Sequence, residues 1–363
     1  MNNVIDYIKW RGDISFKNDP FNEIDALIIA RFAYMDLEGI GDDHITIREA
    51  YDKYHETQDI RKIVIEEDRE LFKFMSESVR FRDIELDDYF SIVDEADTRQ
   101  ISAVTLYIRD IDISIVSFRG TDNTLIGWKE DFMLTFEDSI SSHKTAAEYL
   151  DKILNHVTSD IIITGHSKGG HLSIVSAILS KGEKKRIRHI YAFDAPGLPK
   201  TLFENPEYNR IIDSITSYIP QTSIVGKMLS HKENTRIISS TAMGPYQHDI
   251  YSWEILGKSF IYLKETTIPS EIIDSTFNDY LNSLSYDDRK TVIESMFDIL
   301  EASGSLTIKD LSNDFFGNMK KMIDKGKSLS PESREVLMKA IKTLASSMTK
   351  ETILQLKESI KSN

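Results

Sequence analysis

Residues 161–179 read IIITGHSKGGHLSIVSAIL, and this stretch decides the fold. Three isoleucines predict a buried strand, and the apolar residues that follow at helical spacing predict a helix as far as Leu179. Between the two lies a G-x-S-x-G motif at 165–169. In a strand, sharp turn and helix of this kind the central serine is exposed as a nucleophile, so we assign that role to Ser167.

The glycines of the motif have a steric reason. A serine in a strained turn can point its hydroxyl out of the sheet only if the flanking residues lack a Cβ that would collide with neighbouring elements. Gly165 and Gly169 meet this condition. The alternative is a glycine-rich turn that buries an ordinary serine. The strand before Ser167 and the helix after it favour the nucleophile.

Strand and helix patterns alternate on both sides of the motif. The predicted strands are 103–108, 113–118, 161–164, 190–193, 215–219 and 236–240, with helices at 145–157 and 169–179 and a hairpin turn at 109–112. This alternation is typical of βαβ units and a mainly parallel sheet, and catalytic groups gather at the carboxyl ends of such strands. The sequence therefore predicts an α/β protein with the α/β-hydrolase fold.

The flanks of this core have helical patterns. Residues 1–100 contain helix-prone stretches at 22–34 and 60–76 and are predicted as a helical N-terminal layer of the hydrolase domain. The α/β-hydrolase core is expected at 101–265. Residues 266–363 have helical patterns again and predict a C-terminal helical appendage.

The composition excludes several classes of protein. No cysteine occurs, so neither a disulfide framework nor a thiolate metal site can form. The net charge of −15 would repel a polyanion, so we expect no nucleic-acid partner. The H-E-x-x-H, Walker and dinucleotide-binding motifs are all missing from the sequence. We therefore expect neither a metal nor a cofactor.

The C-terminal residues differ in charge from the rest of the chain. From Lys320 to Asn363 there are ten Lys or Arg against five Asp or Glu. Apolar residues at helical spacing within 336–344 would give a basic amphipathic helix, which suits peripheral contact with an anionic lipid surface. The alternative, a packed helical bundle with solvated lysines, is the commoner arrangement.

The N-terminal residues lack a basic region followed by an apolar stretch, and no run of eighteen apolar residues occurs. We expect a cytoplasmic protein. Export by a route that needs no cleavable signal stays open, and the sequence does not indicate an oligomeric state.

An ester hydrolase needs donors that bind the oxyanion of its tetrahedral intermediate. In this fold one donor is the backbone N–H of the residue after the nucleophile, here Lys168. The second comes from a loop after an early strand. The strand ending in Phe118 is followed by Arg119-Gly120-Thr121, and Gly120 would let Thr121 approach the serine. The alternative is an ordinary β-turn.

The general base must be a histidine that follows the serine in the chain. Of the four histidines after Ser167, His171 lies one turn into the helix, His189 precedes a strand at its wrong end, and His231 lies in a basic stretch. His248 lies in a loop after the last predicted strand, where the base belongs. We therefore assign it as the base, against the alternative of a structural histidine.

Two motifs resemble class 3 lipases of the α/β-hydrolase superfamily. They are Phe118-Arg-Gly-Thr121, with Trp128 and Asp131 downstream, and the glycine-rich segment 165–170. Further stretches resemble a bacterial family of lipase-like proteins with a domain of unknown function: 6–13, 22–25, 191–197, 218–226 and 247–249. The resemblance spans most of residues 1–300 and implies a lipase or lysophospholipase-like serine hydrolase.

The acid of the triad departs from the class 3 pattern. Those lipases carry it in an Asp-x-Val-Pro segment, and the corresponding stretch here, Ser223-Ile-Val-Gly226, has no carboxylate. Some α/β hydrolases draw the acid from the end of the preceding strand, where this sequence has Asp194. We therefore assign Asp194 as the acid. The alternative is that Asp194 caps the turn at Pro196-Gly197.

Together these residues predict hydrolysis of acyl esters through a Ser-His-Asp triad and an acyl-enzyme, with a lipid or a small acyl ester as substrate. Two alternatives stay open. One is a non-catalytic binding or scaffold protein that has kept the hydrolase fold, suggested by the missing acid at Ser223. The other is an acyltransferase or thioesterase that uses the same serine and histidine.

Overall fold

The computed structural model describes residues 2–41, 44–56, 65–122, 124–134, 136–266 and Lys290. The predicted C-terminal appendage, 266–363, lies outside these residues apart from Thr266 and Lys290. The basic helix expected for peripheral membrane contact lies outside them as well.

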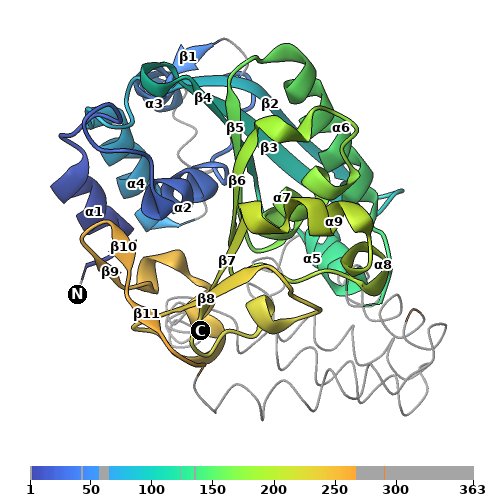
Figure 1. The fold of residues 1–363 in the computed structure, drawn as a ribbon. Coiled ribbons are helices and arrows are strands. Elements are labelled where there is room, and N and C mark those ends of the chain that lie inside the picture. The colour runs from blue at the N-terminus through green and yellow to red at the C-terminus, as the bar shows by residue number, and fades with distance from the viewer. Residues whose placement is uncertain are drawn as a thin grey trace, which may run out of the picture.

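A nine-stranded sheet runs through the described part of the chain (Figure 1). In their order across the sheet, the strands are β1 (Ile45–Thr46), β2 (Glu85–Asp94), β3 (Arg99–Ile108), β4 (Ile113–Phe118), β5 (Asp160–His166), β6 (Ile187–Phe193), β7 (Ile215–Pro220), β8 (Asn234–Ile238) and β11 (Tyr262–Leu263). A separate two-stranded sheet pairs β9 (Ile255–Leu256) with β10 (Ser259–Phe260).

The centre of the large sheet is parallel, as predicted. Strands β4 to β8 all pair in parallel, with Phe118 of β4 opposite Gly165 of β5 and His166 opposite Phe193 of β6. Antiparallel strands flank this centre on both sides. The predicted hairpin is confirmed, because β3 and β4 are antiparallel and Asp112 turns the chain with φ +52°.

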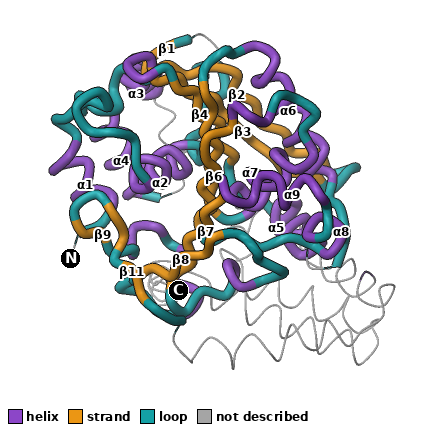
Figure 2. Tube along the Cα trace, in the orientation of Figure 1, coloured by secondary structure: helices purple, strands orange, loops and turns teal. Residues whose placement is uncertain are grey.

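Helices cover both faces of the sheet (Figures 1 and 2). One side carries α1 (Val4–Arg11), α2 (Glu23–Phe32), α3 (Ile47–Glu56) and α4 (Glu66–Glu77), and the other carries α6 (Ser141–His156), α7 (Lys168–Leu179) and α9 (Pro206–Ile211). Helices α5 (Leu125–Met133) and α8 (Lys200–Phe203) follow the ends of β4 and β6. Short 3₁₀ helices are η2 (Arg109–Ile111), η3 (Lys184–Arg186), η4 (Ile212–Ser214), η5 (Val225–Lys227), η6 (Gly244–His248) and η7 (Ile250–Ser252).

The isoleucines of β5 show how the sheet divides the core. Successive strand residues point to opposite faces. Ile162 packs into the apolar cluster beneath α1 to α4, whereas Ile161 and Ile163 pack into the cluster beneath α6 and α7. Because both faces are covered, the strand carries isoleucines toward both of them, as is typical of a central parallel strand.

A buried ion pair ties the N-terminal helices together. The guanidinium of Arg80 donates to the carboxylate of Asp25, from Nε at 2.7 Å, and neither side chain is exposed. Tyr7 on α1 donates to the same carboxylate at 3.0 Å. Asn22 caps α2 by accepting from the N–H of Ile24. Tyr7 lies in the stretch 6–13, and Asn22 and Asp25 lie in the stretch 22–25, so both stretches have a structural role.

The prediction of a helical layer over residues 1–100 is wrong for 85–94, which form strand β2. The segment reads ELDDYFSIVD, and the acidic residues at its start obscured the strand pattern. A bulge between Asp87 and Phe90 further breaks the alternation of buried and exposed residues. The sheet therefore extends beyond the N-terminal limit of the predicted core, 101–265, through β2 and β1 at one edge.

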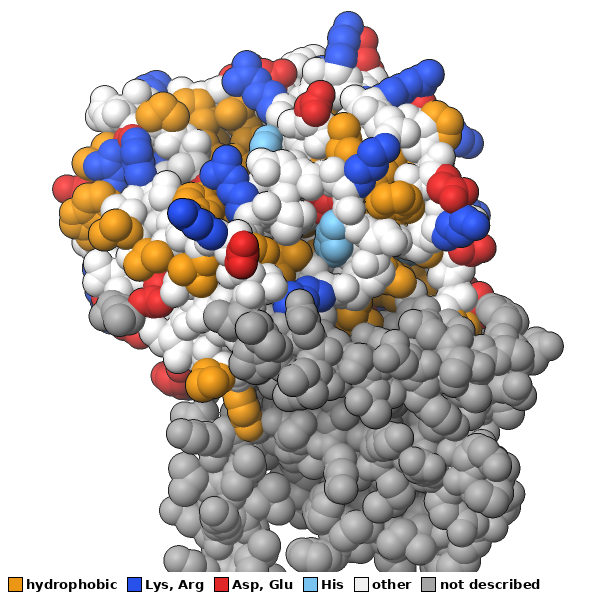
Figure 3. Space-filling view, turned by 60° about the horizontal axis from the view of Figure 1, so that its bottom comes forward, with side chains coloured by type: hydrophobic (Ala, Val, Ile, Leu, Met, Phe, Trp, Pro, Cys, Tyr) orange, Lys and Arg blue, Asp and Glu red, His pale blue; other side chains and the backbone are white. Residues whose placement is uncertain are grey.

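The surface mixes charged and apolar side chains. Figure 3 shows Lys and Arg interspersed with Asp and Glu on the face that it presents. Among the helices that the structure describes, none is both long enough and apolar enough to cross a membrane. Large apolar side chains that are exposed include Met243, at 72%, and Leu256, at 73%.

Candidate active site

The predicted site residues lie at the carboxyl ends of successive parallel strands. Ser167 follows β5, Asp194 follows β6, and Thr121 is three residues beyond the end of β4. His248 ends η6, the first helical turn after β8. Because the carboxyl ends of parallel strands meet at one edge of a sheet, the chain brings these residues to a common edge.

Ser167 occupies a strained turn between β5 and α7. Its backbone has φ 60° and ψ −133°, a conformation that non-glycine residues rarely adopt. Its N–H donates to Phe193 O at 2.9 Å, and its carbonyl accepts from Gly170 N at 3.0 Å. The turn is therefore anchored to β6 on one side and to the first turn of α7 on the other.

The two glycines of the motif are required by close packing, as expected. A Cβ on Gly165 would lie 2.2 Å from the backbone carbon of Gly169. A Cβ on Gly169 would lie 2.1 Å from the carbonyl oxygen of Phe118, at the end of β4. These distances are too short for any side chain, so the turn that holds Ser167, which is 8% exposed, depends on both glycines.

The side chains of His248 and Asp194 contact each other directly. The Nδ1–H of His248 donates to Asp194 Oδ2 at 2.7 Å. The carboxylate is 1% exposed, whereas the imidazole is 32% exposed. A neutral imidazole that donates from Nδ1 has its lone pair on Nε2, so Asp194 leaves the exposed nitrogen of His248 able to accept a proton.

The second oxygen of Asp194 is held by the segment Ser223-Ile-Val-Gly226. Ser223 Oγ donates to Asp194 Oδ1, and Gly226 N–H donates to the same oxygen at 3.1 Å. Ser223 therefore supports a carboxylate that comes from the neighbouring strand. The alternative role of Asp194, capping the turn at 196–197, is not needed to explain its position.

His166, the residue before Ser167, contacts the loop that carries His248. Its Nε2–H donates to the backbone carbonyl of His248 at 2.9 Å, and the two rings lie 4.5 Å apart. Tyr34 O–H donates to His166 Nδ1 at 3.0 Å. Burial holds the pKa of His166 well below its usual value, so the ring is neutral and both hydrogen bonds form together.

The loop of His248 is also fixed by its other neighbour in the chain. Gln247 is fully buried, and its side-chain oxygen accepts from Thr222 N–H at 2.7 Å. Its backbone carbonyl accepts from Trp253 Nε1–H at 2.7 Å. Gln247 thus links the loop after β8 to the loop after β7, which also supports Asp194.

The residues predicted to supply the oxyanion donors are Lys168, which follows Ser167 in the chain, and Thr121, which follows Gly120. Lys168 N–H belongs to the first turn of α7, whose N–H groups have no acceptor within the helix. A Cβ placed on Gly120 would lie 3.1 Å from Ser167 Cβ. Thr121 follows Gly120, and its hydroxyl donates to Asp131 Oδ2.

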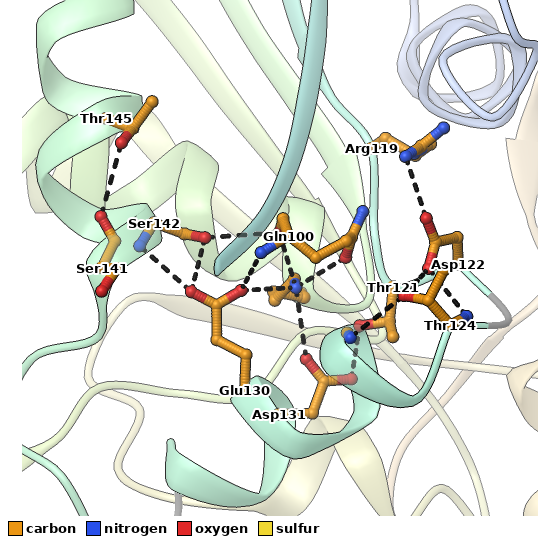
Figure 4. Close-up of polar contacts among 12 residues, drawn as sticks. Gln100, Arg119, Thr121, Asp122, Thr124, Glu130, Asp131, Ser141, Ser142 and Thr145 are labelled. Carbon is orange, nitrogen blue, oxygen red and sulfur yellow. Dashed lines mark hydrogen bonds and ion pairs between the residues drawn. The ribbon is translucent and has the colours of Figure 1, made fainter. Parts of the chain in front are cut away.

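The side chain of Lys168 is buried in a polar cluster with Gln100 and Glu130, and Figure 4 shows these two partners. The lysine side chain is 1% exposed, and Nζ donates to Gln100 O at 2.8 Å, to Gln100 Oε1 at 2.7 Å and to Glu130 Oε2 at 3.0 Å. Asp131 Oδ1 lies 3.8 Å from the same nitrogen. Burial raises the pKa of Asp131 to about 6, although Lys168 and Thr121 favour the charged form.

The histidines rejected as bases have other partners. His171 is fully buried on α7, and its Nε2 lies 2.9 Å from His143 Nε2. His189 lies within β6, not before it as predicted, and its Nε2 is 3.1 Å from Thr216 Oγ1. His231 Nδ1 contacts Glu233 at 2.8 Å. None of these contacts involves a residue assigned to the site.

Buried histidines make a testable contribution to stability. Burial lowers the pKa of His189 to about 4, below its unfolded value of about 6.5. The unfolded chain then binds more protons between these values, so this stability is present above pH 6.5 and is lost as the pH falls. Urea melts of His189→Gln between pH 6.5 and 5 should show a shallower decline than the wild type, by up to about 1.4 kcal/mol per pH unit.

His156→Gln is the matched control, because His156 is an exposed residue on α6. Its pH dependence should equal that of the wild type. The same slope in His189→Gln and wild type would contradict the prediction.

Several residues of the site were missed from the sequence. Tyr34 lies 132 residues before His166, and no local pattern links them. The supporting role of Ser223 was hidden because only a missing carboxylate was noted there. Glu130 directly precedes Asp131, a residue that belongs to the motif resembling class 3 lipases. This position beside Asp131 was the one feature of the sequence that could have indicated Glu130.

Comparisons with known sequences identify a family. The sequence profile of the Mbeg1-like family matches residues 75–298. Among curated proteins, no sequence match is found.

Structural comparison finds several lipases, each with a TM-score under 0.5. A lipase from Rhizopus microsporus var. chinensis is 15% identical with a TM-score of 0.39, and the match covers 68% of this chain and 83% of that one. M37 lipase is 16% identical with a TM-score of 0.37, over 57% and 69% of the two chains. For Lip2 lipase from Yarrowia lipolytica the identity is 13% and the TM-score 0.32, and the match covers 43% of this chain and 65% of that one.

Proposed function

The chain belongs to the Mbeg1-like family, and from the geometry at the carboxyl edge of its sheet we propose that it is a serine hydrolase that cleaves acyl esters. One observation carries the proposal: the 2.7 Å hydrogen bond from His248 to the buried carboxylate of Asp194. It forms on a loop that contacts the residue before Ser167. A serine turn beside an imidazole with a carboxylate behind it is the arrangement that activates a hydroxyl.

In the proposed reaction Asp194 holds His248 with its proton on Nδ1. His248 Nε2 takes the proton of Ser167 as Oγ attacks the ester carbonyl, and it then gives that proton to the leaving alcohol. A water molecule, deprotonated by His248, attacks the acyl-enzyme. The carboxylic acid is released, and the proton returns to Ser167 Oγ.

The negative oxygen of the tetrahedral intermediate would be bound by Lys168 N–H and by the Thr121 segment. The first donor is fixed by α7, and the second by the close contact of Gly120 with Ser167. Preorganised donors of this kind supply a large part of the rate enhancement in acyl transfer.

We place the substrate among lipid esters, in the manner of a lipase or lysophospholipase. Met243 and Tyr246 lie on the segment that leads to His248, and their side chains are 72% and 40% exposed. Exposed apolar side chains beside an active site suit contact with an acyl chain. A non-catalytic scaffold was suggested by the missing acid at Ser223, and the contact of Asp194 with His248 argues against it.

The proposal is tested by labelling and turnover of the full chain. We expect a fluorophosphonate to add one adduct to the wild-type protein by intact mass, and a series of p-nitrophenyl esters to show turnover that rises with acyl length. A thioester substrate and an added alcohol acceptor separate thioesterase and transferase activity from hydrolysis. A folded protein that neither forms the adduct nor hydrolyses any ester would contradict the proposal.

A further inference from the structure

The side chain that follows the nucleophile is buried in an unusual position for a lysine. Lysine is almost never fully buried unless it is paired. Lys168 is 1% exposed, and its ammonium contacts β3 through Gln100 and α5 through Glu130. The residue whose backbone N–H is a proposed oxyanion donor is therefore also bound, through its side chain, to the helix after β4.

Glu130 holds the Lys168 ammonium in place between β3 and α5. Its carboxylate is fully buried and accepts four hydrogen bonds (Figure 4). Gln100 N and Lys168 Nζ donate to Oε2 at 2.9 and 3.0 Å, and Ser142 N and Oγ donate to Oε1 at 3.1 and 2.6 Å. Glu130 thereby fixes α5 to β3, to α6 and to the start of α7.

Asp131, the next residue on α5, connects this helix to Thr121. Its Oδ2 accepts a hydrogen bond from the Thr121 hydroxyl, and its Oδ1 lies 3.8 Å from Lys168 Nζ. A Cβ on Gly127, one turn earlier on α5, would lie only 2.9 Å from Thr121 Cγ2. The position of Thr121 therefore depends on where α5 lies.

We propose that the Lys168 side chain is a positioning residue for the oxyanion hole, which fixes α5 and through it Thr121 relative to the Lys168 N–H. This inference rests on the proposed function. One residue then serves both sides of the hole, with its backbone as one donor and its ammonium as the anchor of the other.

Charge gives a reason for a lysine at this position. Glu130 and Asp131 are adjacent carboxylates, and Glu130 is fully buried. Without the ammonium they would repel each other in a site of low dielectric, and Asp131 would favour its protonated form. A protonated Asp131 accepts the hydrogen bond from the Thr121 hydroxyl less strongly than the carboxylate does. Lys168 therefore stabilises the arrangement in which Asp131 holds the Thr121 hydroxyl.

A purely structural ion pair is the competing explanation, and a double-mutant cycle separates the two. Thr121→Val removes the hydroxyl, and Lys168→Met removes the ammonium. Because Lys168→Met leaves Glu130 buried without its cation, Lys168→Met/Glu130→Gln is the second variant and the one expected to fold. Lys184→Met/Glu207→Gln, which removes the ion pair of 2.9 Å between η3 and α9, is the matched control.

For each variant we would measure the rate of fluorophosphonate labelling, kcat and KM for a soluble p-nitrophenyl ester, and the melting temperature. Thr121→Val and Lys168→Met/Glu130→Gln should each lower kcat about 10- to 100-fold with little change in KM, as expected for weakened oxyanion binding. The triple variant should be no more than about threefold slower than the slower of the two, because both act on one donor. The control pair should keep the wild-type kcat.

Multiplicative losses in the triple variant would overturn the inference. So would a Lys168→Met/Glu130→Gln protein that melts earlier but keeps the wild-type kcat, since its role would then be structural. A wild-type protein that is neither labelled nor active would overturn the proposed function, and this inference with it.

Discussion

Replacing Ser167 with alanine is expected to abolish fluorophosphonate labelling and to lower kcat for p-nitrophenyl esters by about 10⁴-fold or more. The nucleophile is lost, and the residual rate would come only from the oxyanion donors and substrate binding. Alanine fits the space of serine, so the turn at φ 60° should persist and the melting temperature should stay close to that of the wild type.

Ser176→Ala is a suitable control, because Ser176 is a buried serine on α7, the helix that follows Ser167, and its hydroxyl donates to the backbone at 3.1 Å. Intact-mass analysis should find one adduct on this control and none on Ser167→Ala. Equal adduct formation on both variants would show that another residue is the nucleophile.

Asp194→Asn is expected to lower kcat by about 10²- to 10⁴-fold while the protein stays folded. Ser223 and Gly226 would still bind the amide oxygen of the new side chain, so its NH₂ group would face His248. An NH₂ donor there requires Nδ1 of His248 to accept, which places the proton on Nε2. That tautomer cannot take the proton of Ser167.

Asp249→Asn is the matched comparison, with the same chemical change at the residue after His248. Asp249 Oδ1 accepts from Tyr251 N–H at 3.1 Å, and an amide oxygen can accept equally well. We expect kcat to fall less than about tenfold in this variant, measured on the same ester. A larger loss in Asp249→Asn than in Asp194→Asn would rule out Asp194 as the acid.

The central strands could be predicted because they are buried on both faces and are therefore rich in apolar residues. Strand β5 is apolar on both faces and is followed by a motif whose geometry needs glycine at two positions. Strand β2 could not be predicted in the same way. Its first residues are acidic and a bulge interrupts its alternation, so packing against β3 overrides a weak local preference.

The candidate site divides along similar lines. Asp194 and His248 were reached by chain order, since the fold leaves few acids and histidines at the ends of the right strands. Tyr34 lies 132 residues from its partner His166, and Glu130 lies 38 residues from its partner Lys168. Their partners are set by tertiary packing, and a single sequence carries no local pattern for such pairs.

Helix α2 has a consequence for how this chain is made in the cell. It is buried over nearly its whole length and lies against β5 and β6, where Thr164 Oγ1 donates to Ala26 O across 138 residues of sequence. At ribosomal speeds of about 5–20 residues per second, α2 is synthesised on the order of ten seconds before the strand that buries it. During this time the apolar residues of α2 are exposed on the nascent chain, where chaperones that bind nascent chains can contact them. Strand β5, which leads to the proposed nucleophile Ser167, is thus also the strand that ends this exposure.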